Sequence, residues 1–187
     1  MPNILVIGAT GSLARTVIAT AAENPALHLA LFARQPRNLP PQYPAIAGDA
    51  LDPAALQAAM RGQDTIYINL AGDLGRMGAN IVAAMQATGG VRRVIAISSI
   101  GIYDTPVRDI LRPYRALADC IENSGLDYTI LRPDWFTNAD EIDYQLTPKG
   151  EPECGHAVSR KSIADFVCKL FADPAKYIGA NLNISKP

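Results

Sequence analysis

Charge and long apolar runs are both scarce in this sequence of 187 residues. Only 19% of the residues are charged, and the formal net charge is −1. A chain so near neutrality has no global field to attract nucleic acid or an anionic membrane, although a local basic patch stays possible. No apolar run approaches the roughly 20 residues that a membrane-spanning helix needs. We therefore expect no direct nucleic-acid partner and no membrane association.

Cysteine and histidine are also rare. The three cysteines, Cys120, Cys154 and Cys168, form an odd set without C-x-x-C spacing, and there are only two histidines. Disulfide frameworks need paired cysteines and zinc sites need more of these ligands, so we expect neither a disulfide nor a metal site. The apolar run Asn3–Ile7 lacks a basic segment before it and ends in Gly8, which favours a strand over a signal peptide. These features favour a reducing, cytoplasmic location.

Short apolar runs alternate with helix-length segments, which is typical of βαβ units around a parallel sheet. The length fits one domain. We predict a single α/β domain over residues 1–187, with a doubly wound, mostly parallel Rossmann-type sheet in the strand order 3-2-1-4-5-6. The predicted strands are 3–7, 28–33, 45–48, 65–71, 91–98 and 127–131, with a last one at 181–184, and the predicted helices are 12–23, 53–61, 76–88, 108–123 and 161–172.

The segment 133–158 is irregular and polar, and it follows the carboxyl end of a predicted strand. Ligands of open α/β sheets bind at that edge. We interpret the segment as a small substrate-side lid near the C-terminus. The alternative is an ordinary surface loop, because many long loops have no such role.

A glycine-rich motif, G-x-x-G-x-x-A, lies between the first predicted strand and the first predicted helix at Gly8–Ala14. Gly8 permits a tight turn, Gly11 lets the backbone approach a diphosphate, and Ala14 lets the helix pack close to the sheet. The N-terminus of the helix offers free N–H groups and a positive dipole to phosphates. The alternative is a glycine-rich turn without a ligand. The candidate cofactor residues here are Gly8, Thr10, Gly11, Ser12 and Leu13.

The end of the second predicted strand decides between the two nicotinamide cofactors. NAD-binding proteins usually have an acidic residue there for the ribose hydroxyl, whereas this chain has Arg34 and Arg37 and no acid. A guanidinium suits a 2′-phosphate because it is always charged and donates two parallel hydrogen bonds. We therefore expect NADP(H) to be preferred, with NAD(H) possible. The alternative is a solvated surface pair.

A second adenosine contact is predicted after the third strand, at Asp49, Ala50 and Leu51. The Asp49 carboxylate is placed to accept a hydrogen bond from the adenine amino group, and Leu51 to pack on the ring. The alternative is an acidic residue that serves the N-terminus of the following helix.

With these motifs, the chain resembles the atypical short-chain dehydrogenases of the NmrA-like, NAD(P)H-binding group, which includes flavin and biliverdin reductases. Further matches are Val94–Ser99 with Gly101, the segment Ser124–Pro133, and Val158–Arg160 followed by Ile163–Asp165. The resemblance implies a cofactor across the carboxyl ends of strands one, two, four and five. It also implies roles near the nicotinamide and its ribose for Asn69, Ala71, Ser98, Arg132 and Pro133.

One departure from that group concerns the acid–base pair Tyr-x-x-x-Lys, because no lysine precedes Lys149. Hydride transfer to a flavin or quinone does not need the pair, since the cofactor carries the chemistry and the protein positions the acceptor. Candidate catalytic residues are Ser98, Tyr103 and Tyr114, unless they are ordinary strand-end hydroxyls or packed aromatics. Trp135 and Phe136 are candidates to stack on an acceptor, or to pack the lid on the core.

These observations leave two functions open. The first is an NADPH-dependent oxidoreductase that reduces a flat small molecule such as a flavin or quinone. The second is a non-catalytic sensor of the dinucleotide that acts through a protein partner, which the missing Tyr–Lys pair favours. An epimerase acting on nucleotide sugars would need a larger substrate domain than the residues after Pro133 allow. We expect a monomer or a homodimer.

Overall fold

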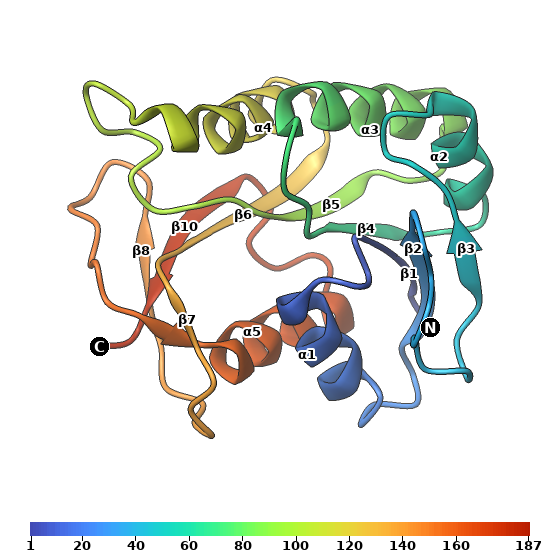
Figure 1. The fold of residues 1–187 in the computed structure, drawn as a ribbon, viewed down its shortest axis with the longest axis horizontal. Coiled ribbons are helices and arrows are strands. Elements are labelled where there is room, and N and C mark those ends of the chain that lie inside the picture. Colours follow the sequence, from blue (N-terminus) through green and yellow to red (C-terminus); the bar gives the residue numbers. More distant parts are fainter.

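A computed structural model, which describes all residues 1–187, contains one eight-stranded sheet in the order β3-β2-β1-β4-β5-β6-β10-β8 (Figure 1). The predicted order 3-2-1-4-5-6 is confirmed, and two further strands extend it. All neighbours pair in parallel except β8, which runs antiparallel to β10. The strands are β1 (Asn3–Ile7), β2 (His28–Ala33), β3 (Ala45–Ala47), β4 (Thr65–Ile68), β5 (Arg93–Ile97), β6 (Asp127–Pro133), β8 (Gln145–Pro148) and β10 (Ala180–Ser185).

Helices cover both faces of the sheet (Figure 1). One face carries α1 (Ser12–Ala21) and α5 (Arg160–Ala172), which pack against each other. The other face carries α2 (Pro53–Met60), α3 (Leu74–Thr88) and α4 (Arg112–Glu122), and α3 contacts both of its neighbours. The structure is therefore the three-layer arrangement that alternating strands and helices predicted.

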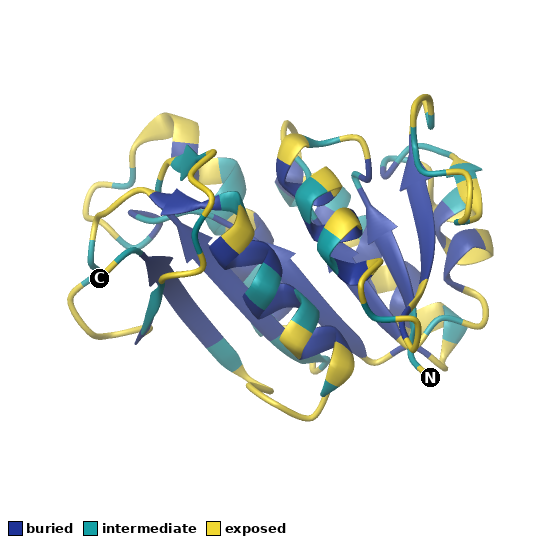
Figure 2. Cartoon of the chain, turned by 90° about the horizontal axis from the view of Figure 1, so that it is seen from below, coloured by how far each residue is buried: buried dark blue, intermediate teal, exposed yellow.

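The strands are apolar because the sheet is covered on both sides (Figure 2). Successive side chains of β1 enter opposite layers: Ile4 and Val6 join the core under α1 and α5, while Leu5 and Ile7 join the core under α2, α3 and α4. All four side chains are fully buried. Burial of one such side chain stabilises the fold by about 1.5–3 kcal/mol.

Two segments differ from the sequence predictions. The predicted helix 108–123 is divided into a 3-10 turn, Asp109–Leu111, and α4, because Pro113 lacks an N–H and is tolerated only in a first turn. The segment 133–158 is less irregular than expected, since it contains β7 (Phe136–Thr137) and β8 and leads into β9 (Val158–Ser159). Strands β7 and β9 form a separate two-stranded parallel sheet.

The helices of the structure are too short or too polar to cross a membrane.

Candidate functional site

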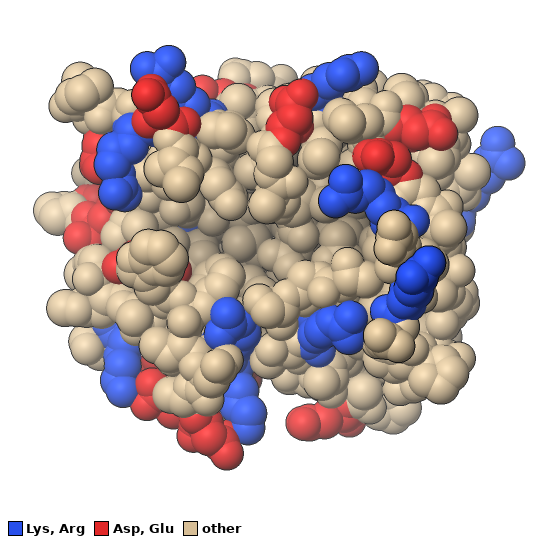
Figure 3. All heavy atoms as spheres, in the orientation of Figure 1, with Lys and Arg blue, Asp and Glu red and all other residues tan.

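A cleft of about 1160 Å³ lies at the carboxyl ends of β1, β2, β4, β5 and β6. In Figure 3, the face drawn in Figure 1 is hollowed near its centre, and lysine and arginine side chains stand around the hollow. Fifteen of the candidate residues line the cleft: Gly8, Thr10, Gly11, Ser12, Leu13, Arg34, Asp49, Ala50, Asn69, Ala71, Ser98, Tyr114, Pro133, Trp135 and Phe136. The structure does not bring Arg37, Leu51, Tyr103 and Arg132 to its lining.

The glycine-rich turn fits tightly against the end of β4. Gly8 has a φ of +89°, and a Cβ there would lie 2.1 Å from the backbone oxygen of Asn69. A Cβ on Gly11 would lie 3.0 Å from Nδ2 of the Asn69 side chain. The N–H groups of Gly8 and Ala9 both donate to the carbonyl of Phe32 on β2. Gly8 is thus required by the packing of the turn itself, in addition to any ligand, whereas a side chain at Gly11 would need only a small shift of the Asn69 side chain.

The N-terminus of α1 is open. Side chains cap three of the other four α-helices, with Asp52 on α2, Asp73 on α3 and Ser159 on α5, and α4 has no side-chain cap. Helix α1 follows Gly11 and likewise has none. Its first N–H groups therefore lack protein acceptors, and the first turn contains no acidic residue. An uncapped helix N-terminus behind a tight glycine turn is the arrangement that holds a dinucleotide diphosphate, so the chain fits this group.

The end of the cleft beside β2 and β3 contains Arg34 and Asp49, which follow these two strands. The Arg34 side chain is exposed and free to approach a phosphate. Asp49 Oδ1 accepts a hydrogen bond from the N–H of Leu51 at 2.9 Å, which directs Leu51 away from the cleft and leaves the second carboxylate oxygen available. Arg37 lies three residues beyond Arg34, past Pro36, and outside the lining.

Ser98 and Tyr114 join β5 to α4 at the other end of the cleft. Ser98 is buried, and its hydroxyl donates to the Tyr114 backbone carbonyl at 3.1 Å. The serine therefore positions the first turn of α4, on which the Tyr114 side chain lines the cleft.

Tyr103 lies elsewhere, in a polar cluster beside α4. Its hydroxyl accepts a hydrogen bond from Asn181 Nδ2 at 2.7 Å, and Lys149 Nζ is 4.4 Å from its ring centroid. Burial raises the pKa of Tyr103. A tyrosine and a lysine thus do meet in this protein, but neither lines the cleft.

Arg132 is held in the same cluster. Its side chain is 1% exposed, forms an ion pair with Glu153, and donates from Nε to Asn181 Oδ1 at 2.7 Å. Burial lowers the pKa of Arg132. Successive residues of β6 point to opposite faces of the sheet, and of Arg132 and Pro133 only Pro133 lines the cleft. Arg132 is therefore a positioning residue, which holds the segment that carries Glu153.

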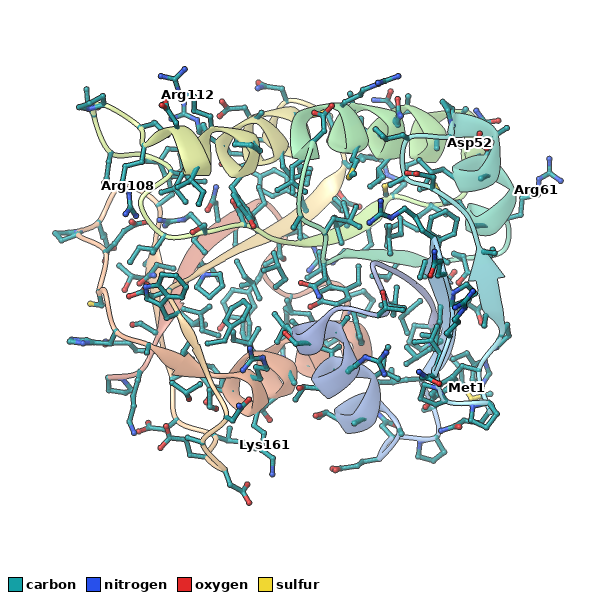
Figure 4. The ribbon with its side chains drawn as sticks, in the orientation of Figure 1. Met1, Asp52, Arg61, Arg108, Arg112 and Lys161 are labelled. Atoms are coloured by element: carbon teal, nitrogen blue, oxygen red, sulfur yellow. The ribbon has the colours of Figure 1, made fainter.

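The end of the cleft at Trp135 and Phe136 also contains residues that the sequence analysis missed. Arg108 and Ile110 line the cleft together with these two aromatic residues. Ile110 and Trp135 are 75% and 82% exposed, which is unusual for such large apolar side chains. Figure 4 shows Arg108 in the loop before α4, at one side of the hollow. No local pattern marks these residues, because only the folded loops bring them together.

The sheet order and the glycine-rich turn at the carboxyl edge define a Rossmann-type dinucleotide-binding protein. The profile of a family described as NAD(P)H-binding matches residues 8–174, and the chain belongs to this family.

Solved structures agree with this assignment. A Rossmann-fold NAD(P)-binding family protein from Shigella flexneri is 44% identical, with a TM-score of 0.91 over 100% of this chain and 94% of that one. A wide-type short-chain dehydrogenase/reductase from Veillonella parvula DSM 2008, in complex with NADP, is 25% identical, with a TM-score of 0.88 over 100% and 95%. ChuY, an anaerobillin reductase from Escherichia coli O157:H7, shares the fold at 19% identity, with a TM-score of 0.86 over 99% and 97%.

Proposed function

We propose that the protein binds NADPH in preference to NADH and reduces a flat acceptor such as a flavin or quinone. The observation that carries this proposal is that one cleft joins a diphosphate cradle, at the uncapped end of α1, to an open aromatic wall at Trp135 and Phe136. When bound, the reduced cofactor supplies the hydride. We further propose that the protein is cytoplasmic, where its three free cysteines fit a reducing compartment, and is a monomer or a homodimer.

The preference for NADPH rests on the end of β2. Arg34 lines the cleft, and the stretch that follows β2 in the sequence, residues 34–40, includes no carboxylate that would hold a ribose hydroxyl and repel a phosphate; the carboxylate at this end of the cleft, Asp49, follows β3 instead. A guanidinium that lacks an ion-pair partner here is available for a 2′-phosphate. One relative solved with NADP supports the same choice.

The acceptor end favours stacking over acid–base chemistry. Trp135 and Phe136 offer ring faces, while the tyrosine–lysine contacts, Tyr103 with Lys149 and Tyr144 with Lys169, lie outside the cleft. A flavin or quinone needs a positioned ring, and the Tyr114 hydroxyl or water can supply the proton at this open end.

We propose that segment 133–158 acts as a substrate-side lid through its first residues, 133–136, which form this wall. One fold neighbour is named a reductase, which supports the same reaction class.

A sensor that reports the bound dinucleotide to a protein partner is the second candidate. The exposed side chains of Ile110 and Trp135 at the rim favour it, because large exposed apolar groups commonly mark interaction sites. The two functions differ in turnover, since only the oxidoreductase consumes NADPH when an acceptor is present.

The first experiment titrates the purified protein with NADPH and NADH by calorimetry, for the wild type, Arg34→Ala and Arg37→Ala. Loss of a hydrogen bond to a charged group costs about 1.5–3 kcal/mol. Because Arg34 is exposed, we expect the lower end of this range, roughly a tenfold weaker affinity for NADPH. The affinity for NADH should not change. Arg37→Ala is the matched control and should behave as the wild type. An unchanged NADPH preference in Arg34→Ala would remove Arg34 from the proposal.

The second experiment measures NADPH oxidation with a panel of flavins and quinones, for the wild type and Trp135→Ala. We expect turnover with at least one acceptor, and a higher KM for it in Trp135→Ala. Binding of NADPH without turnover across the panel, together with recovery of a partner protein that depends on the dinucleotide, would favour the sensor.

A further inference from the structure

Arg160, the first residue of α5, reaches the glycine-rich turn at the other end of the sequence. Its Nε donates to the hydroxyl of Ser12 at 3.3 Å. Ser12 is the first residue of α1 and lines the cleft beside the uncapped N–H groups. Arg160 does not itself line the cleft, but this bond places its guanidinium against Ser12, which does, and so beside the proposed diphosphate position.

The same guanidinium holds the acceptor wall. Its Nη1 donates to Asn138 Oδ1 at 2.8 Å and to the Thr137 carbonyl at 3.4 Å. Its Cζ lies 5.3 Å from the ring centroid of Phe136, which lines the cleft. One cation thus contacts both the phosphate side and the acceptor side of the site.

The positive charge of Arg160 has no negative partner. All three of its oxygen acceptors are neutral, and none of the ion pairs in the chain includes it. Those bonds use Nε and Nη1, which leaves the N–H groups of Nη2 for another acceptor. The next residue, Lys161, is different: it forms an ion pair with Asp140 and points away from the body of the molecule (Figure 4). An unpaired guanidinium is suited to a phosphate, which accepts charged hydrogen bonds from it.

We propose that Arg160 is a ligand of the cofactor diphosphate and joins it to Phe136, the last residue of the acceptor wall, and to the two residues after it, so that dinucleotide binding fixes the wall. This inference rests on the proposed dinucleotide binding. It assigns different parts of the cofactor to two arginines: Arg34 recognises the 2′-phosphate, and Arg160 recognises the diphosphate that NADPH and NADH share.

The test uses ligands that separate the two groups. ADP-ribose has the diphosphate and no 2′-phosphate, whereas 2′-AMP has the reverse. Affinities for both are measured by calorimetry on the wild type, Arg160→Gln, Arg160→Lys and Lys161→Gln. Since Arg160 is only partly buried, we expect Arg160→Gln to weaken ADP-ribose roughly tenfold, the low end for a charged hydrogen bond. The affinity for 2′-AMP should stay within about twofold.

The control variants check charge and fold. Lys161→Gln removes one positive charge from the adjacent position of the same helix and should leave both affinities unchanged. Arg160→Lys keeps the charge without the planar fork and should lie between the wild type and Arg160→Gln. Equal affinity of the wild type and Arg160→Gln for ADP-ribose would overturn the inference, and so would an equal loss for both ligands. A wild type that binds neither ADP-ribose nor NADPH would refute the proposed function itself.

Trp135, the only tryptophan of the chain, reports the coupling directly, because it precedes Phe136 and is 82% exposed. ADP-ribose lacks the nicotinamide that would contact this side chain. At saturating ADP-ribose, we expect a change of Trp135 fluorescence in the wild type and a smaller one in Arg160→Gln. Equal changes in the two proteins at saturation would show that Arg160 does not fix the wall.

Discussion

The ion pair between Arg132 and Glu153 provides the sharpest test of how the acceptor end is held in place. Glu153 also accepts a hydrogen bond from the N–H of Gly101 at 2.9 Å, so one carboxylate joins β6, the loop after β5 and the segment before β9. The side chain of Arg132 is 1% exposed and that of Glu153 is 20% exposed. The substitution Glu153→Gln keeps the size of the side chain and removes its charge, which leaves the buried Arg132 without its ion-pair partner.

The expected cost follows from this burial. Removal of one partner from a buried ion pair typically costs 3–5 kcal/mol, because the other charge stays buried and unpaired. Water reaches part of Glu153, so the lower end of the range applies, about 3 kcal/mol. For a domain of this size, 1 kcal/mol shifts the unfolding midpoint by roughly 2–4 °C, so Glu153→Gln should lower the midpoint by about 6–12 °C.

Circular dichroism during thermal unfolding measures this shift. Asp140→Asn is the matched control, because it neutralises the carboxylate of an ion pair whose two side chains, Lys161 and Asp140, are both largely exposed. It should leave the midpoint close to that of the wild type. The double variant Arg132→Met, Glu153→Leu removes both charges and should recover most of the loss. A Glu153→Gln protein that melts with the wild type would refute the reasoning.

Two further predictions concern the glycine turn and the partly buried thiol of Cys168. Gly8→Ala should lower both the thermal midpoint and the affinity for NADPH, because the new Cβ would overlap the Asn69 carbonyl. The control is Gly125→Ala: Gly125 has a φ of +72° and open space at its Cβ, so this variant should lose only the roughly 1–2 kcal/mol of a left-handed residue and keep full binding. Equal losses in the two variants would contradict this prediction. Burial raises the pKa of the Cys168 thiol to about 12, above the roughly 8.5 of an unfolded chain. The unfolded state therefore loses its proton first, and the free energy of unfolding should fall as the pH rises from about 8.5 to 12, by up to about 1.4 kcal/mol per pH unit for this group. Urea unfolding at several pH values should show a smaller fall in Cys168→Ala, and an identical fall would count against the buried thiol.

The parts of the fold that follow from local patterns were predicted correctly from the sequence. Continuous apolar runs and the glycine motif between a strand and a helix are local features that indicate a Rossmann-type sheet, and the strand order 3-2-1-4-5-6 and a cleft at the carboxyl edge are typical of that topology. Strands β7 and β9 were missed because each has two residues and is defined only by its pairing with a segment about 20 residues away. Pairing of this kind leaves no periodic signal in either segment.

The candidate site shows the same limit at the level of single residues. Gly8, Gly11 and Ser12 lie in the cleft because they connect the carboxyl end of β1 to the N-terminus of α1, and the cleft is at that edge of the sheet. Arg132 was included by resemblance, although the alternation along β6 turns it to the opposite face from Pro133. Tyr103 follows Gly101, whose φ of +77° redirects the chain after β5, and the tyrosine enters the cluster with Lys149 instead of the cleft. Such a change of direction has no signature beyond the glycine itself.

The contacts of segment 133–158 limit what a lid can be in this protein. Its middle part, β8, is hydrogen-bonded into the edge of the main sheet, and its later part is tied to Arg132 through Glu153. Within this segment, only residues 133–136 line the cleft, and Arg160 hydrogen-bonds to Asn138, two residues further along the chain. Any movement that admits an acceptor must therefore involve the short stretch from Asp134 to Asn138, or the opposite wall at Arg108 and Ile110, while the rest of the segment stays fixed to the sheet. Acceptor selectivity should follow from substitutions in these two stretches, whereas substitutions in β8 should change stability.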